Sequence, residues 1–133
     1  MFSSGLNAWT AIPRTTGRVF WVAPSASYTY AGNTYNASDG NDGLHPKRAL
    51  LTLARAVVLA TASVGDVIVL FPGAHVTAGA LAVSKAGLTF VGLPYQFDSS
   101  KALDGYPQAS ITGTAAIGVA VTAANVTFMN IKF

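Results

Sequence analysis

Residues 81–93, LAVSKAGLTFVGL, return without gaps as residues 119–131, VAVTAANVTFMNI. Five of the thirteen positions are identical, and most of the others are conservative exchanges. Each copy has the pattern of a short apolar strand, a tight turn that carries Gly87 or Asn125, and a second short strand. Such repeats are typical of solenoid proteins, in which each unit covers the open face of its neighbour. The repeat predicts a mainly β chain, and we expect further residues or other chains to cover the second copy.

Outward from the repeat, short strands and one helix account for most of the chain. Pro46 is expected to open a helix that runs to about residue 61, because proline is favoured in a first helical turn. Gly65 is its expected C-cap. The helix has an apolar face at helical spacing, which consists of Leu50, Leu53, Ala54, Val57, Val58 and Thr61. The expected strands are residues 19–23, 67–71, 81–84, 88–91, 110–112, 119–122 and 126–133.

Three segments carry the signals of irregular structure. Residues 1–18 are rich in Ser, Thr, Gly and Asn and are expected to form an extended arm. Residues 25–45 form a predicted long polar loop, and residues 92–109 form a second excursion. We therefore predict two regions, the arm at residues 1–18 and a folded region at residues 19–133.

The composition indicates a protein that associates with other chains. Of the 133 residues, 51% are hydrophobic and only 10% are charged, and the mean hydropathy is +0.44. A single domain of this size cannot easily hide so much apolar surface. The longest apolar runs, residues 50–62 and 67–72, are interrupted or too short to cross a bilayer. We therefore predict no membrane insertion.

Charge and cysteine content narrow the function classes further. The formal net charge of +3 is small and dispersed, which argues against nucleic-acid binding. The absence of cysteine excludes disulfides and thiolate metal sites. Residues 1–5 have neither the basic start nor the following apolar stretch of a secretory signal peptide. If the protein acts outside a cell, we expect it to leave by another route, such as lysis.

Three further stretches carry a resemblance to a known superfamily. Residues 39–46, DGNDGLHP, followed by residues 51–56, LTLARA, and residues 65–75, GDVIVLFPGAH, resemble the opening of right-handed parallel β-helix proteins of the pectate-lyase-like type. The resemblance spans residues 19–133. It implies a right-handed, single-stranded parallel β-helix, a solenoid with an N-terminal capping α-helix. Because unrelated activities share this scaffold, the resemblance informs on the fold more than on the chemistry.

Oxygen ligands cluster in the sequence DGNDG. Asp39, Asn41 and Asp42 have spacings similar to those of a calcium loop, so Ca²⁺ is the one candidate cofactor. The same residue types form turns, and the spaced carboxylates and distal Glu of an EF-hand are absent. Cation binding and turn formation both stay open. His45 and His75 are too isolated in the sequence to define a metal site.

Three tyrosines, Tyr28, Tyr30 and Tyr35, lie on the predicted loop at residues 25–45. Tyrosine rings can stack on sugars in carbohydrate sites, and they are also common at protein–protein interfaces. The apolar composition of the chain favours the interface, and the carbohydrate site is the alternative.

The sequence assigns no catalytic residue. A polysaccharide hydrolase needs paired carboxylates. Asp98 and Asp104 are close in sequence, but they lie among turn residues, where solvated turn carboxylates are the alternative. The acid cluster and arginine base that the resemblance associates with pectate-lyase-like eliminases have no counterpart on the predicted strands.

The resemblance implies a structural protein of a bacteriophage virion, since tailspikes, tail fibres, head fibres and capsid decorations share this opening. We expect a role in particle assembly or host adhesion, and association as a homotrimer. Residues 1–18, with Trp9 and Ile12 as anchors, are the candidate docking segment for other virion proteins. A host surface glycan is a further candidate partner. The alternative function is a polysaccharide depolymerase, lyase-like, whose catalytic coils lie beyond residue 133 or between subunits.

Overall fold

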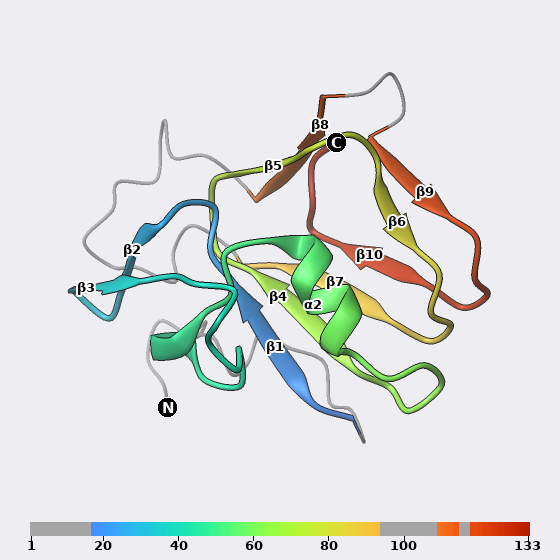
Figure 1. Ribbon diagram of the computed structural model, residues 1–133, viewed down its shortest axis with the longest axis horizontal. Helices are drawn as coiled ribbons and strands as arrows, with labels where there is room; N and C mark the ends of the chain where they lie inside the picture. Colours follow the sequence, from blue (N-terminus) through green and yellow to red (C-terminus); the bar gives the residue numbers. More distant parts are fainter. Residues whose placement is uncertain (1–16, 94–108, 115–117) are drawn as a thin grey trace.

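The computed structural model describes residues 17–93, 109–114 and 118–133 (Figure 1). Its largest sheet has four parallel strands in the order β1 (Val19–Val22), β4 (Val67–Leu70), β7 (Thr89–Gly92) and β10 (Thr127–Met129). Two smaller parallel sheets pair β5 (Ala74–Thr77) with β8 (Ser110–Gly113), and β6 (Leu81–Val83) with β9 (Val119–Val121). The prediction of a mainly β chain is confirmed, and most of its strands are parallel.

The chain visits the three parallel sheets in a fixed order. It passes through β4, β5 and β6, then through β7, β8 and β9, and then enters β10; each such passage is called a circuit below. Strands of one circuit pair with their counterparts in the next, so that Val67 lies beside Thr89, and Thr89 beside Thr127. The two copies of the sequence repeat therefore lie side by side, with β6 on β9 and β7 on β10 (Figure 1).

Side chains at the same position in successive circuits stack into ladders. The register aligns Phe20, Ile68, Phe90 and Phe128 on one face of the four-stranded sheet. The first three are buried in a core that also includes side chains of β6, β8 and the helix. Burial of one such side chain contributes roughly 1.5–3 kcal/mol, so the ladders are a major favourable term in folding.

The opposite face of this sheet carries a second core, which is aromatic. Trp21, Val69 and Val91 form its ladder. The ring centroid of Phe71 lies 5.7 Å from that of Trp21 and 5.1 Å from that of Tyr28. Because the sheet is buried on both faces, β4 can be apolar at every position, VIVL.

Residues 25–45 are not the long loop predicted from the sequence. They contain an antiparallel hairpin of β2 (Ser27–Tyr30) and β3 (Asn33–Asn36). Ala31 and Gly32, with φ angles of 52° and 82°, close it as the two left-handed residues of a type I′ turn. The tyrosines of the hairpin pack against the aromatic core. Most residues of the hairpin are polar or tyrosine, and this composition conceals the strand pattern.

The predicted helix over residues 46–61 is too long. The structure has a 3₁₀ turn, η1 (Pro46–Arg48), and a separate helix, α2 (Leu53–Leu59). Between them, Leu50 pairs with β1: its N–H donates to the carbonyl of Trp21, and its carbonyl accepts from the N–H of Ala23. This pairing requires extended backbone, so the helix begins only after Thr52, whose hydroxyl accepts from the N–H of Arg55.

Helix α2 packs on the first strand of each parallel sheet. Its buried residues Leu53, Ala56 and Val57 lie in the core, and the helix contacts β1, β5 and β6. Ala54 and Val58, which were predicted on the apolar face, are exposed instead. The ammonium group of Lys85 donates to the carbonyls of Val58 and Ala60 at the end of the helix. A helix in this position protects the sheet edges from pairing with other chains.

A left-handed residue marks the same turn in three successive circuits. Gly65, Gly87 and Asn125 lie two residues before β4, β7 and β10 and have φ angles of 82°, 80° and 59°. Glycine and asparagine adopt this conformation more readily than other residues. The predicted turns at Gly87 and Asn125 are confirmed. The expectation for Gly65 is wrong, because the helix C-cap is Ala60.

The carboxylate of Asp66 is fully buried and links three segments. It accepts the N–H of Arg18 on one oxygen and the N–H of Thr61 on the other, both at 2.7 Å. The guanidinium of Arg18 lies 3.6 Å from the same carboxylate and also donates to the carbonyl of Leu59. The start of β1, the end of α2 and the start of β4 thus meet at one side chain.

We predict that Asp66→Asn lowers the free energy of unfolding by about 2–4 kcal/mol, because an amide nitrogen replaces one acceptor and leaves a buried N–H unpaired. Urea denaturation followed by tryptophan fluorescence measures this loss. Asp42→Asn is the matched control, since Asp42 lies on the surface, and its midpoint should stay close to wild type. Equal midpoints for the two variants would contradict the role of Asp66.

Candidate functional site

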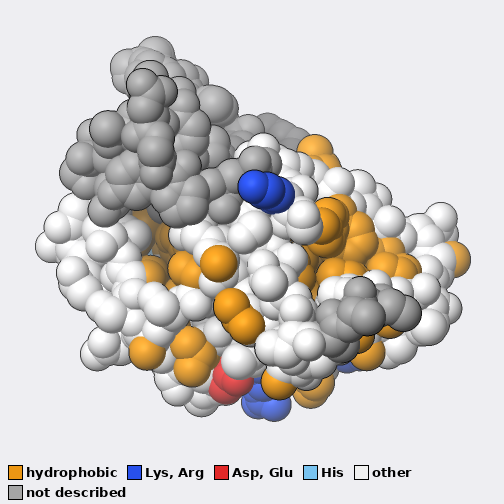
Figure 2. All heavy atoms as spheres, turned by 90° about the horizontal axis from the view of Figure 1, so that it is seen from above, with side chains coloured by type: hydrophobic (Ala, Val, Ile, Leu, Met, Phe, Trp, Pro, Cys, Tyr) orange, Lys and Arg blue, Asp and Glu red, His pale blue; other side chains and the backbone are white. Residues whose placement is uncertain are grey.

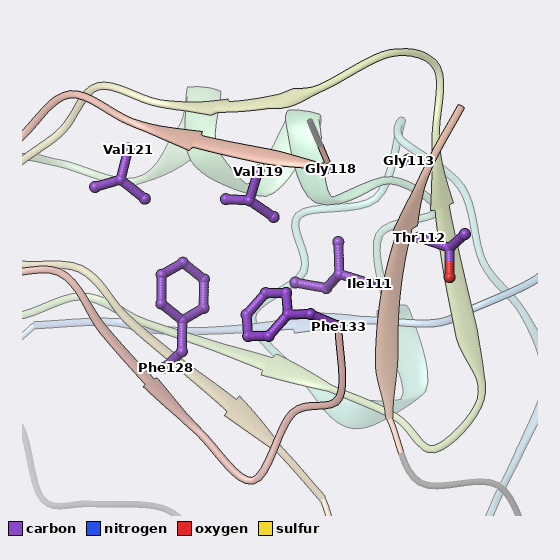
Figure 3. Close-up of a pocket in the computed structure, with 8 residues that line it drawn as sticks. All are labelled: Ile111, Thr112, Gly113, Gly118, Val119, Val121, Phe128 and Phe133. Atoms are coloured by element: carbon purple, nitrogen blue, oxygen red, sulfur yellow. The ribbon is translucent and has the colours of Figure 1, made fainter. Parts of the chain in front are cut away.

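Strands β8, β9 and β10, the last strands of the three parallel sheets, surround a hollow of about 450 Å³ (Figure 3). We call this surface the open end; it is lined by Ile111, Thr112, Gly113, Gly118, Val119, Val121, Phe128 and Phe133. Figure 3 shows Val119 and Val121 of β9 facing Phe128 of β10 across the hollow, with Phe133 beside Phe128 and Ile111 on the side of β8. Figure 2 views the molecule from the side of β5 and β8, and hydrophobic side chains there form a patch with few charged groups.

Equivalent residues of the two repeat copies differ in burial. Val83 is 0% exposed, whereas its neighbour Val121 is 45% exposed. Phe90 is likewise buried, whereas Phe128 is only partly buried. The second copy covers the first, and no described residue forms a complete third layer over the second. The open end therefore has the composition of a core surface, and among the described residues no further layer covers it.

Aromatic rings extend from the core into the open end. The rings of Phe90 and Phe128 stack at 4.8 Å between centroids with an angle of 11° between their planes. Phe133 meets Phe128 edge-on at 5.4 Å and is 67% exposed. A further apolar side chain can extend this column without displacing any charged group.

The β5–β8 sheet already has the beginning of a third strand. Lys132 forms a parallel bridge with Ser110: its N–H donates to the carbonyl of Ala109, and its carbonyl accepts from the N–H of Ile111. These two bonds are 3.0 Å and 2.9 Å long. Lys132 thus occupies the position that follows Ala74 and Ser110 in the ladder of this sheet.

The described lining of the open end is almost entirely apolar. None of its eight residues carries an acid, a base or a charged group, and Thr112 is its one polar side chain. Such a surface can take apolar side chains in the hollow and backbone hydrogen bonds along the strand edges.

We predict that Val83→Ala lowers the free energy of unfolding by about 2 kcal/mol, because it leaves a cavity in a closed core. Val121→Ala should cost under about 0.5 kcal/mol, since that side chain is already half exposed. The two variants make the same chemical change at equivalent repeat positions, and urea unfolding compares them. Equal losses would mean that Val121 is covered in solution.

The three candidate calcium ligands make hydrogen bonds within the protein. Asp39 accepts from the N–H groups of Leu51 and Thr52 and from the Thr52 hydroxyl. Asn41 donates from its amide to the carbonyl of Ala49. These contacts fix the backbone before α2, and Ca²⁺ binding here stays a prediction.

Asp42 is the most exposed of the three acidic side chains that the structure describes. The N–H of Leu44, together with the guanidinium of Arg48, holds the pKa of Asp42 below its usual value. Among the described residues, no three His, Cys, Asp or Glu side chains lie close enough together to form a metal-binding group.

The three candidate interface tyrosines lie together, but they differ in exposure. Tyr28 is buried: its hydroxyl donates to the carbonyl of Pro46 and accepts from the N–H of Ala49. Burial raises the pKa of the Tyr28 hydroxyl. Tyr30 and Tyr35 are partly exposed, with 6.4 Å between their ring centroids. Of the three rings, these two retain surface for a sugar or a protein partner.

The sequence assigns no role to His75. In the structure its side chain, on β5, is buried. Its Nε2 donates to the carbonyl of Phe71 at 2.8 Å. Burial lowers the pKa of His75 from 6.5 to about 4, and the hydrogen bond to Phe71 opposes this shift only in part. His75 is therefore neutral in the folded protein at neutral pH.

This burial predicts a loss of stability in mild acid. Between pH 6.5 and about 4 the unfolded chain binds a proton at His75 that the folded chain does not bind. The stability present above pH 6.5 should therefore fall as the pH is lowered, by on the order of 3 kcal/mol in total. Urea unfolding at several pH values measures the slope, and His75→Gln should flatten it. An unchanged slope in the variant would assign the effect to other groups.

Four predicted residues lie outside the described part of the chain. They are the docking anchors Trp9 and Ile12 and the carboxylates Asp98 and Asp104. In the part that is described, no helix is long and apolar enough to span a membrane.

A second apolar surface lies between α2 and the strands β5 and β6. This lateral groove has a volume of about 540 Å³ and includes Val57, Leu81 and Ala82. Val58 and Val76, which also line it, are 63% and 64% exposed. The sequence predicts that the second repeat copy needs a cover, but it identifies neither the residues of the open end nor the lateral groove, because a residue's place in a ladder or beside a helix follows from the strand register.

Comparison with known proteins finds no matching family model, no matching curated protein and no matching solved structure.

Proposed function

We propose that this chain is the helix-capped portion of a right-handed parallel β-helix and serves as a structural protein of a bacteriophage virion. Its place would be an appendage or capsid decoration, such as a tailspike, tail fibre or head fibre, with a role in particle assembly or host adhesion. The observation that carries the proposal is the open end, an apolar surface bounded by the last described strands of the three parallel sheets, which suits assembly with further β structure.

The parallel registers support the β-helix part of the proposal. Three sheets visited in order, with one strand added to each per circuit, are what a solenoid of this kind requires. The turn residues Gly65, Gly87 and Asn125 repeat with the circuits. Helix α2 on the first strands has the place of a solenoid cap, which prevents edge pairing on that side.

The hydrogen bonds and the ion pair of the described acidic side chains support a structural role. Asp39 and Asp66 accept two or more hydrogen bonds each from the protein, and Asp42 pairs with Arg48. Each of these carboxylates thus has a place in the architecture. A depolymerase would require an acid pair elsewhere, and the test below includes that outcome.

We further propose a homotrimer with side-by-side contacts and docking to other virion proteins through the N-terminal arm. The lateral groove supports the first part, because Val58 and Val76 expose apolar surface on the flank of the molecule. Association of three copies would remove such surface from water.

The test is incorporation into particles of the source virus. Deletion of residues 1–16 keeps Arg18 and its bonds to Asp66, so the fold should persist in circular dichroism while the chain disappears from purified particles. Peptide mass spectrometry quantifies the chain against a capsid protein, and native mass spectrometry should show three copies of the full chain. Wild-type incorporation of the deletion variant would refute docking through the arm. Release of reducing or unsaturated ends from a host glycan by the full chain would favour the depolymerase.

A further inference from the structure

We infer that the open end is a binding surface for one more parallel β circuit, with aliphatic side chains over Val119 and Val121 and an aromatic or aliphatic side chain over Phe128. The inference rests on the proposed β-helix fold, but it does not depend on a role in a virion. It identifies the occupant by its chemistry: a parallel β segment with the apolar pattern of residues 76–93.

The strand edges define the direction of this occupant. The three sheets end in β8, β9 and β10 among the described residues, and every pair within these sheets is parallel. A segment that follows the same circuit can pair with the edges of β9 and β10 and continue the pairing that Lys132 begins on β8. It would also place its inward side chains on the ladders that contain Val83 and Val121, and Phe90 and Phe128.

Lys132 argues against a second copy of the chain as the occupant. Two copies that meet end to end about a twofold axis would bring their edges together antiparallel. In this molecule the edge of β8 is already engaged by Lys132, which runs parallel to it and makes two backbone hydrogen bonds there. Phe133 then projects into the hollow against Phe128. The start of the third layer thus already has the parallel direction.

The register specifies how an extension must be designed. Lys132 is level with Ser110 and Ala74, which brings Phe133 level with Ile111 and His75. A copy of residues 76–93 placed after Phe133 would therefore continue the circuit in register. Its matched control has the same length and carries Leu81→Ser, Val83→Ser, Leu88→Ser and Phe90→Ser within the copy.

The experiment compares the thermal unfolding of the full chain with and without these extensions. The apolar copy should raise the melting temperature by roughly 5 °C or more and reduce binding of the dye ANS, whereas the serine control should do neither. Val121→Asp should have little effect in the unextended chain, where the side chain is half exposed, and should cancel the gain in the extended chain. A gain with both extensions, or with neither, would overturn the inference.

Sedimentation velocity of the unextended chain tests the competing occupant. A concentration-dependent dimer that Val121→Asp converts to monomer would show that a second copy covers the open end, and it would also overturn the inference. Neither measurement involves particles. A negative result here therefore leaves the virion proposal standing, and a negative incorporation test leaves this inference standing.

Discussion

A buried carboxylate holds together the segments at which the fold begins. Asp66 and Leu88 occupy equivalent positions, just before β4 and β7. The backbone carbonyl of Asp66 accepts from the N–H of Thr89 in β7, and that of Leu88 accepts from the N–H of Thr127 in β10. An apolar residue there would pack, but it could not bond to Arg18 or Thr61. The chain between β1 and β4 contains α2 where the circuits that follow have strands, so backbone groups at this junction need other partners. The buried carboxylate of Asp66 supplies these hydrogen-bond partners. Burying its charge costs free energy, and the hydrogen bonds that it accepts offset this cost.

Beyond this junction the architecture is nearly linear. The strands of each circuit lie on those of the circuit before it, and their side chains stack in the ladders. At one end, helix α2 covers the first strand of each parallel sheet. At the other end, the ladders of the described strands finish with Val121, which is 45% exposed, and Phe128, which is partly buried. The described part of the molecule is thus asymmetric along its stacking direction, with a helix on one side and apolar side chains that are partly exposed on the other.

The sequence predicts the parts of this fold that repeat. The aligned copies and the turns at Gly87 and Asn125 could be found because ladder positions recur with the same residue types. Elements that occur once were missed or misjudged. Leu50 fits helical spacing and also a strand bridge, and only its pairing with β1 decides between them. The β2–β3 hairpin has the composition of a loop, although Ala31-Gly32 between alternating residues was an available signal. The open end could not be outlined, because the difference between Val83 and Val121 lies in their cover and not in their chemistry.

The connections between sheets have a consequence for how this architecture can diversify. Residues 71–73 connect β4 to β5, whereas residues 93–109 make the corresponding connection from β7 to β8. The pairing of β5 with β8 is nonetheless in register over all four residues. Chain length at this corner is therefore independent of the core. Insertions of different size and sequence can accumulate there under selection for new contacts, while the ladders that keep the protein folded stay unchanged.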